Sequence, residues 1–173
     1  MIIKYIGALL IVISSSAIGF RLSSDLKLRI EELSILKKIA LMLRGEIKYT
    51  STPLFEAFSV IGNRIKSPYK EFLLETAKEL EELNGTSFAV IWEKMKKKHL
   101  EKTKLYDKDL DRLISLGENL GYLDKEMQIG TIELYLDNLE QETIEAKNNI
   151  VKNSRLYQYL GVASGILITI LIL

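Results

Sequence analysis

Few residues of this sequence have side chains suited to catalysis. His99 is the only histidine, and it lies among lysines whose positive charge disfavours a bound metal cation. The chain has no cysteine, which excludes disulfides, thiolate metal sites and thiol nucleophiles. The acidic runs Glu81–Glu82 and Asp107–Asp111 fall on exposed faces or near an expected helix start, where a carboxylate stabilises the helix N-terminus. The sequence also lacks a P-loop, a glycine-rich dinucleotide turn and a His-Glu-x-x-His pair. We therefore expect no enzymatic activity, no cofactor and no metal site.

One catalytic alternative remains open at this level, an enzyme that acts at a membrane. It requires Glu46, Tyr49 and Asp124 to converge on one pocket. Carboxylates that are separated and solvated would exclude it.

The charged segments favour binding over catalysis. The segment from residue 94 to 104, called here the basic segment, contains six lysines and one glutamate: Lys94, Lys96, Lys97, Lys98, Lys102 and Lys104, with Glu101. It predicts a surface that docks an acidic partner or lies near anionic lipid headgroups. The simpler interpretation is a solvated helix face. Four glutamates form an acidic counterpart, and the two patches could instead face each other between helices: Glu75, Glu79, Glu81 and Glu82.

Charge is confined to the middle of the chain. All 23 acidic residues lie between Asp25 and Glu145, and Lys4 is the only charged side chain outside residues 21–155. The middle therefore has no net charge. Nucleic-acid binding requires a basic excess that displaces counterions, so we expect no nucleic-acid partner.

The two ends are apolar, and each approaches the roughly 20 residues that a membrane-spanning helix needs. We predict transmembrane segments at residues 1–20 and 156–173, with Tyr157 and Tyr159 at a membrane interface. Lysines and arginines flank both segments on the body side, which predicts a cytoplasmic domain over residues 21–155 and both termini across the membrane. Two alternatives remain. The first segment could be a signal peptide cleaved near Ser14–Ala17, and the second could be a buried core helix.

Two glycine pairs have a spacing of four residues. Gly161 and Gly165 form the small-xxx-small pattern that allows close helix approach in a membrane, which predicts packing of the two spans or a homo-oligomer. Gly117 and Gly121 fall near a helix end, where turn formation is the simpler reason for glycine.

Helical periodicity dominates the middle of the chain. An apolar stripe from Leu26 to Ile47 predicts a first helix that runs unbroken to about Tyr49. A 3,4 repeat from Ile129 to Ile150 predicts a last helix packed along a partner. Thr52-Pro53 and Ser67-Pro68 are expected to start two helices with proline at the first helical position, and Ser87 and Asp124 are expected N-caps. We predict an all-α fold: a six-helix bundle whose long first and last helices extend into the two transmembrane segments.

The order and spacing of several short motifs resemble the stage III sporulation protein AB family of endospore-forming bacteria along essentially the whole chain. These motifs are Gly7-Ala-Leu-Leu-Ile11 with Gly19, Glu46-Ile-Lys-Tyr49, Thr52-Pro-Leu-Phe-Glu-Ala57, Trp92, Leu116-Gly-x-x-Leu-Gly121 with Asp124 and Gln128, and Leu160-Gly-x-x-x-Gly165.

The resemblance implies a component of the mother cell–forespore channel complex, in the mother cell membrane that faces the forespore. The family is also similar to the cytoplasmic domain of the platform proteins of type II secretion and type IV pilus machines. It therefore implies a membrane platform that docks a cytoplasmic secretion-type ATPase and contacts other channel proteins. It implies no catalytic residue. A pore-forming or holin-like membrane protein is the competing function, and it would need polar residues lining the spans.

Overall fold

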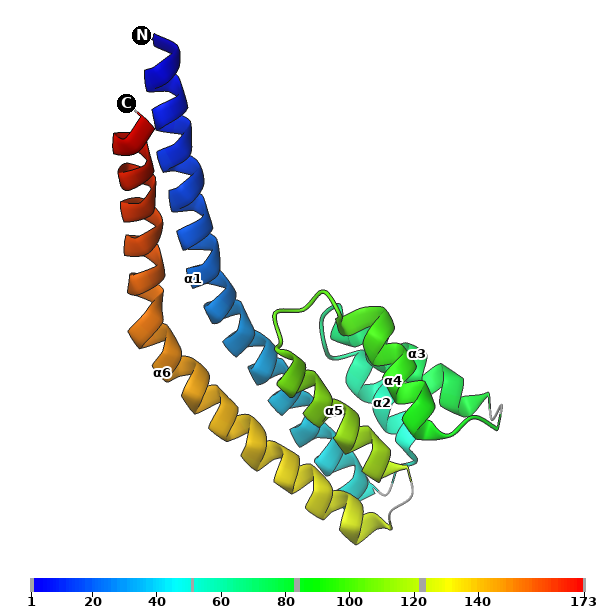
Figure 1. The fold of residues 1–173 in the computed structure, drawn as a ribbon. Coiled ribbons are helices and arrows are strands. Elements are labelled where there is room, and N and C mark those ends of the chain that lie inside the picture. Colours follow the sequence, from blue (N-terminus) through cyan, green and yellow to red (C-terminus); the bar gives the residue numbers. More distant parts are fainter. Residues whose placement is uncertain (1, 51, 83–84, 122–123, 173) are drawn as a thin grey trace. The chain divides into compact units, whose positions relative to one another are not determined.

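The computed structural model describes residues 2–50, 52–82, 85–121 and 124–172, and every regular element among them is helical. The elements are α1 (Ile2–Gly45), a π-helical turn η1 (Glu46–Thr50), α2 (Leu54–Gly62), α3 (Tyr69–Glu81), α4 (Phe88–Leu100), α5 (Asp107–Leu120) and α6 (Lys125–Ile172) (Figure 1). The all-α prediction is confirmed, and the six expected helices correspond to α1–α6. The side chains of Lys4 and Tyr157, used above, lie outside the described residues.

The chain divides into two compact units. The central unit comprises residues 32–142, and the terminal unit comprises residues 1–31 with residues 143–173. The terminal unit therefore extends farther along both long helices than the predicted spans at residues 1–20 and 156–173. Among the described residues, no helical segment combines the length and the apolar character that crossing a membrane requires.

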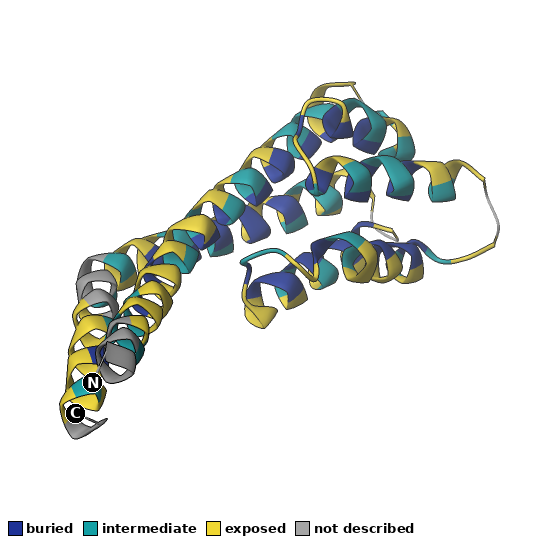
Figure 2. Ribbon diagram, turned by 90° about the horizontal axis from the view of Figure 1, so that it is seen from above, coloured by how far each residue is buried: buried dark blue, intermediate teal, exposed yellow. Residues whose placement is uncertain are grey.

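Within the central unit, α1 and α6 run antiparallel. Lys37 forms an ion pair with Glu140, and Arg44 Nη1 lies 3.5 Å from Glu133 Oε1. The partner on α6 therefore has a lower residue number as the residue number on α1 rises. The predicted apolar stripe and the 3,4 repeat both contribute to the core, and their buried members are Leu33, Leu36, Ala40, Leu43, Ile47, Ile132, Leu136 and Leu139. In Figure 2, buried residues (dark blue) recur at intervals along the helices. The apolar periodicity thus identified the packed faces correctly.

An aromatic cluster joins α2, α3 and α4. The Trp92 ring of α4 lies 4.6 Å from the Phe72 ring and 5.3 Å from the Phe58 ring, measured between centroids. Phe88 stacks on Phe58 at 5.8 Å, and the Trp92 indole N–H donates to the Leu113 carbonyl of α5 at 2.7 Å. All four rings are buried, so they are the core that holds these helices together.

The helix starts differ in detail from the expected caps. Pro53 and Pro68 occupy the N-cap positions of α2 and α3 rather than the first helical positions, and Ser87 makes no side-chain cap hydrogen bond. Asp124 does cap α6, because its Oδ1 accepts from the Met127 backbone N–H at 2.9 Å. Gly85 has a φ of +70°, the left-handed conformation expected after α3.

Candidate functional site

The basic segment lies on α4 and the turn that follows it, and two of its lysines pair with the acidic counterpart on α3. Lys94 Nζ lies 2.8 Å from Glu79 Oε1, and Lys98 Nζ pairs with Glu75 Oε2. The interpretation in which the two patches face each other is therefore correct for these four residues. The pairs also show that α3 and α4 are antiparallel, with residue 94 level with residue 79 and residue 98 level with residue 75.

His99 is more enclosed than the surface histidine that its lysine-rich neighbourhood suggested. Its side chain is 13% exposed, and Nε2 lies 3.0 Å from Glu75 Oε2. The hydrogen bond from Lys98 lowers the pKa of Glu75, and the hydrogen bond from His99 lowers it further. The described residues include no cluster of three or more side chains able to hold a metal ion.

The other lysines of the basic segment differ from these two. Lys97 and Lys102 are exposed and Lys96 is half-buried. No carboxylate among the described residues forms an ion pair with Lys96, Lys97 or Lys102. Lys104 is half-buried and has an interaction of its own. The part of the basic segment open to a partner is therefore Lys96, Lys97 and Lys102.

A polar cluster that the sequence analysis did not identify lies between four helices of the central unit. Tyr69 of α3 donates to Glu32 of α1 at 2.6 Å. Glu142 of α6 accepts from Arg112 and Lys108 of α5, the latter at 2.7 Å, and its side chain is only 5% exposed. These three polar links join α1 to α3 and α5 to α6. The 3,4 repeat could have indicated that Glu142 is buried, because it places this residue beside the apolar residues of α6 rather than on the outer face.

Tyr135 belongs to the same region. Its hydroxyl is buried and makes no hydrogen bond to the described residues. Burial raises the pKa of Tyr135, the Asp109 carboxylate raises it further, and Arg112 opposes that rise. Burial also raises the pKa of Tyr69, with the hydrogen bond to Glu32 as the second cause. Both phenols therefore remain protonated at neutral pH, which excludes them as general bases.

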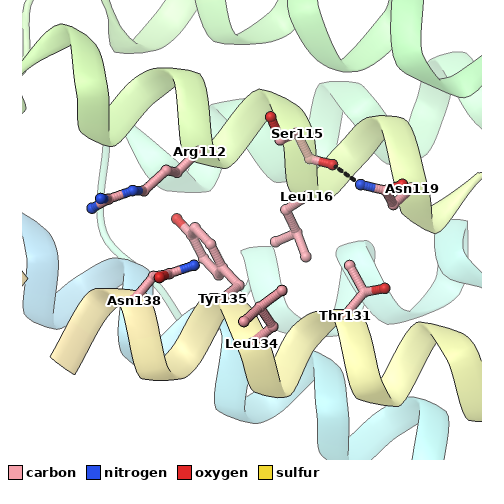
Figure 3. A pocket seen from close by; sticks show the side chains of 8 residues that line it. All are labelled: Arg112, Ser115, Leu116, Asn119, Thr131, Leu134, Tyr135 and Asn138. Atoms are coloured by element: carbon pink, nitrogen blue, oxygen red, sulfur yellow. Dashed lines mark hydrogen bonds between the residues drawn. The ribbon is translucent and has the colours of Figure 1, made fainter. Parts of the chain in front are cut away.

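A pocket of about 100 Å³ lies between α5 and α6 beside Tyr135, with four lining side chains from each helix (Figure 3). They are Arg112, Ser115, Leu116 and Asn119 of α5, with Thr131, Leu134, Tyr135 and Asn138 of α6. Small-molecule sites usually occupy about 300–1,000 Å³. A volume of about 100 Å³ holds roughly three waters, so this pocket does not suit a substrate.

The catalytic alternative based on Glu46, Tyr49 and Asp124 is not supported. Glu46 accepts from the hydroxyls of Thr50 and Thr52 at 3.2 and 3.4 Å, whereas Asp124 caps α6. Tyr49 is 80% exposed. Each carboxylate thus has a local structural role, and the tyrosine projects into solvent.

Gly117 has a packing role that the turn interpretation missed. It is buried within α5, and a Cβ added there would lie 2.2 Å from Cδ1 of Trp92. A Cβ at Gly121 would lie 3.0 Å from the Phe88 Cβ, and the φ of Gly121 is an ordinary −72°. The prediction of a turn is wrong for Gly117, which lies within α5, and correct for Gly121, which is the C-cap of α5 and lies in a turn. Both glycines also make room for the aromatic cluster.

Gly161 and Gly165 lie where the two ends of the chain meet in the terminal unit. A Cβ at Gly161 would lie 2.9 Å from the Ser15 carbonyl oxygen and 3.0 Å from the Gly19 Cα, and one at Gly165 would lie 3.0 Å from the Val12 Cα. The Ser15 hydroxyl bonds the Gly161 carbonyl and lies 2.8 Å from the Ser164 hydroxyl. Two backbones approach this closely only where side chains are absent.

Three comparisons with known proteins point to the same family. The model of the family described as stage III sporulation protein AB matches residues 4–173. Stage III sporulation protein AB of Bacillus subtilis (strain 168) is 27% identical over 171 residues, which cover 99% of each chain. A solved structure of stage III sporulation protein AB superimposes with a TM-score of 0.65 and 26% identity, over 71% of this chain and 96% of that one.

Proposed function

Because the chain belongs to the stage III sporulation protein AB family, we propose that it is a non-enzymatic assembly component of the mother cell–forespore channel complex in sporulation. In this proposal the apolar ends anchor the protein in the mother cell membrane that faces the forespore. The central unit lies in the cytoplasm and docks a secretion-type ATPase, as a platform protein would. Other channel proteins assemble around it.

The observation that carries the proposal is the close backbone contact between the two chain ends. The α1 backbone lies so close to Gly161 and Gly165 that a methyl group at either glycine would collide with it. The two ends carry no acidic residue before Asp25 or after Glu145. A pair of apolar helices in such contact suits a lipid environment, where packing of small residues and a few hydrogen bonds hold helices together.

The proposal includes no enzymatic role, because the charged side chains make structural contacts. The carboxylates of the described polar clusters bind lysines, arginines, hydroxyls or helix N-termini. The pocket beside Tyr135 is also too small for a substrate. A rigid helical body with these features suits a docking surface.

Lys96, Lys97 and Lys102 are the proposed contact for an acidic surface of the ATPase. They belong to the basic segment and take no part in the ion pairs between α3 and α4. Opposite charge across an interface raises the association rate and disfavours wrong partners. The contact should therefore weaken with salt.

The test is co-purification of the cytoplasmic ATPase of the complex with the full-length protein from membranes of sporulating cells. We expect charge reversal of Lys96, Lys97 and Lys102 to glutamate to abolish co-purification. A matched control reverses Lys48, Lys78 and Lys125, which changes the net charge equally. Unchanged complex assembly in the basic-segment variant, with the fold intact by circular dichroism, would refute the docking surface.

Hydrogen bonds of the polar side chains in the chain ends disfavour the pore-forming alternative. A pore lining needs free polar side chains, but Ser15 bonds Gly161 and Ser164, Ser16 bonds the Val12 carbonyl, and Thr169 bonds the Gly165 carbonyl. Ion conductance of liposomes that contain the purified protein separates the two functions. We expect no conductance above that of empty liposomes.

The membrane topology can be tested directly. Labelling of single cysteines at the two termini from each side of the membrane should modify both from the side opposite the central unit. Modification of either terminus from the cytoplasmic side would contradict the two-span arrangement.

A further inference from the structure

Acidic charge is concentrated on α5 and the first part of α6. Residues 107–142 contain ten acids against three bases, a net charge of −7, although the whole chain has a net charge of +1. All of these residues belong to the central unit. The fold itself uses some of these carboxylates, so the charge that remains open must be counted residue by residue.

Half of the ten acids have a structural partner within the central unit. These five form ion pairs or hydrogen bonds: Asp109, Asp124, Glu133, Glu140 and Glu142. The other five are exposed and form no ion pair with the described residues: Asp107, Asp111, Glu118, Glu126 and Asp137. All three bases have partners, since Lys108 and Arg112 bind Glu142 and Lys125 has an interaction of its own. The unpaired charge on these two helices is therefore entirely negative.

Three of the open acids flank the pocket between α5 and α6. Asp111 comes four residues before Ser115 and Glu118 three residues after it, and residues at these spacings are neighbours on a helix surface. Asp137 comes three residues after Leu134. Ser115 and Leu134 both line the pocket. Carboxylates from both helices therefore lie at its rim.

The lining of the pocket combines apolar surface with hydrogen-bond acceptors. Leu116 and Leu134 supply the apolar part, and hydroxyls and amides supply the polar part. The Asn119 side-chain nitrogen donates to the Ser115 carbonyl at 2.7 Å, which leaves the Asn119 amide oxygen as an available acceptor. Asn138 provides a second amide on the α6 side. A ligand with an apolar stem and a donating head would match both parts of this lining.

The buried hydroxyl of Tyr135 indicates that the pocket has an occupant. The Tyr135 side chain is only 5% exposed, and its hydroxyl has no hydrogen-bond partner among the described residues. Figure 3 shows the ring reaching from α6 toward α5, with the hydroxyl on the Arg112 side of the pocket. A buried polar group without a partner costs free energy, and a ligand that bonds it recovers that cost.

The charges around this hydroxyl favour a cation. The Asp109 carboxylate raises the pKa of Tyr135 by more than Arg112 lowers it, so the local potential is negative. The hydroxyl is covered from solvent, and an incoming group reaches it only if lining side chains rotate. Arg112 has room to do so, because its side chain is 40% exposed. Access therefore requires no movement of the backbone.

We propose that the pocket between α5 and α6 binds the end of a lysine side chain from a basic segment of a partner protein. The apolar stem of the lysine packs on Leu116 and Leu134, and its ammonium group donates to the Tyr135 oxygen and to the amide oxygens of the lining. A volume of about 100 Å³, equal to roughly three waters, suits the ammonium group and the methylenes next to it. The carboxylates at the rim attract the remaining positive charge of the segment.

The test measures peptide binding to the full-length protein in detergent micelles by fluorescence anisotropy. The probe is a fluorescein-labelled, alanine-based peptide with one central lysine and flanking arginines. A second peptide has norleucine in place of the lysine, which keeps the stem and removes the ammonium group. We expect the lysine peptide to bind about tenfold more tightly, as loss of a hydrogen bond from a charged donor predicts. Equal binding of the two peptides, or no binding of either, would overturn the inference.

Tyr135→Phe shows whether the lysine enters the pocket. This variant removes only the unpaired hydroxyl, so the fold is expected to persist. It should weaken binding of the lysine peptide severalfold and leave binding of the norleucine peptide unchanged, because the two changes then remove the same contact. An equal effect of Tyr135→Phe on both peptides would exclude contact between the ammonium group and the hydroxyl.

Two triple variants with the same change in charge test the rim. Asp111→Asn, Glu118→Gln and Asp137→Asn together should weaken both peptides and reduce the salt dependence of binding. The control combines Glu81→Gln, Glu93→Gln and Glu101→Gln, which are exposed acids on or next to α3 and α4. Equal loss in the two triple variants would reduce the attraction to net charge and contradict the site.

A second copy of the chain is the competing occupant, since its basic segment is also rich in lysine. Mass photometry of the full-length protein separates the two occupants. We expect the rim variant and the wild type to have the same oligomeric state. Self-association of the wild type that the rim variant abolishes would assign the surface to a second copy and overturn the proposed partner.

Discussion

Gly117 shows how one missing methyl group determines the packing of α5 on α4. The Trp92 indole occupies the space that any side chain at Gly117 would need. The same indole contacts Phe58 and Phe72 and donates a hydrogen bond to Leu113, so it has little freedom to move. Added volume at Gly117 is therefore expected to destabilise this region.

We predict that Gly117→Ala destabilises the protein by about 1–3 kcal/mol, because a Cβ at 2.2 Å from Trp92 forces the ring or the helix to shift. The intrinsic helix preference for alanine over glycine, about 1 kcal/mol, acts in the opposite direction. Chemical denaturation followed by tryptophan fluorescence measures the change. Gly130→Ala in α6 is the control, since a Cβ there meets nothing within 4 Å and should stabilise. A Gly117→Ala protein as stable as Gly130→Ala would contradict this packing.

Tyr69 and Tyr135 form a matched pair, since both are buried phenols but only Tyr69 has a hydrogen-bond partner. Tyr69→Phe removes a donor from the Glu32 carboxylate and should cost about 1.5–3 kcal/mol. Tyr135→Phe removes an unpaired buried hydroxyl and should be neutral or slightly stabilising. Thermal unfolding of both variants at neutral pH gives the comparison. Equal losses would show that the Tyr135 hydroxyl has a partner after all.

These two phenols also predict alkaline instability. Because folding raises both pKa values above the ordinary value of 10.0, the neutral phenols contribute stability below about pH 10, and that contribution is lost as the pH rises toward the folded pKa values. The protein with Tyr135→Phe should lose less stability than the wild type between neutral pH and pH values above 10.

At the level of helices, α3 and α4 are joined by a ladder of charges as well as by aromatic rings. The ladder consists of Glu79 with Lys94, and Glu75 with Lys98 and His99. Except for the His99 ring, these side chains are at least one-third exposed, so each pair is expected to contribute less than about 1 kcal/mol. The ladder therefore sets the register of the two helices more than it stabilises them.

We predict that Glu75→Gln reduces the acid sensitivity of the fold. The pKa of Glu75 is lowered on folding, so its contribution is present above the unfolded value near 4.5 and is lost as the pH falls through the folded value. Wild type should therefore lose more stability than Glu75→Gln as the pH falls from about 5. Denaturation at a series of pH values tests this, and Glu81→Gln, at the end of the same helix and outside the ladder, provides a control. Parallel pH curves for wild type and Glu75→Gln would exclude the contribution.

For the whole molecule, the contact at Gly161 and Gly165 determines whether the two apolar chain ends can act as one anchor. The Ser15 and Gly19 backbone atoms closest to Gly161 cannot move aside as a side chain could. A groove of about 390 Å³ with Ile18, Leu22 and Leu160 in its lining lies beside this contact. Separation of the helices would break the hydrogen bonds that Ser15 makes to the Gly161 carbonyl and to the Ser164 hydroxyl.

We predict that Gly161→Val separates the two chain ends, because its side chain would overlap the α1 backbone. The measurement is energy transfer between fluorophores on single cysteines introduced near Ser14 and Ala163, in detergent or nanodiscs, with an expected fall in transfer efficiency. Gly7→Val is the control, since a Cβ at Gly7 meets nothing within 4 Å. Equal transfer in both variants would show that the pair does not depend on this contact.

Residues close in sequence determined much of what is known about this protein. Apolar spacing of three and four predicted the helices, the packed faces of α1 and α6 and the cap at Asp124, since these depend on local backbone geometry. The order of short motifs along the chain indicated the family that the comparisons support.

Contacts between residues far apart in sequence were decided only by the tertiary structure. The partner of each lysine in the basic segment depends on the register of α4 against α3, which helical periodicity does not specify. The buried cluster around Glu142, and the reason for glycine at position 117, depend on which helix lies opposite and how closely. Local periodicity specifies the face that a helix buries, whereas the side chains that meet across that face are selected by packing of the whole unit.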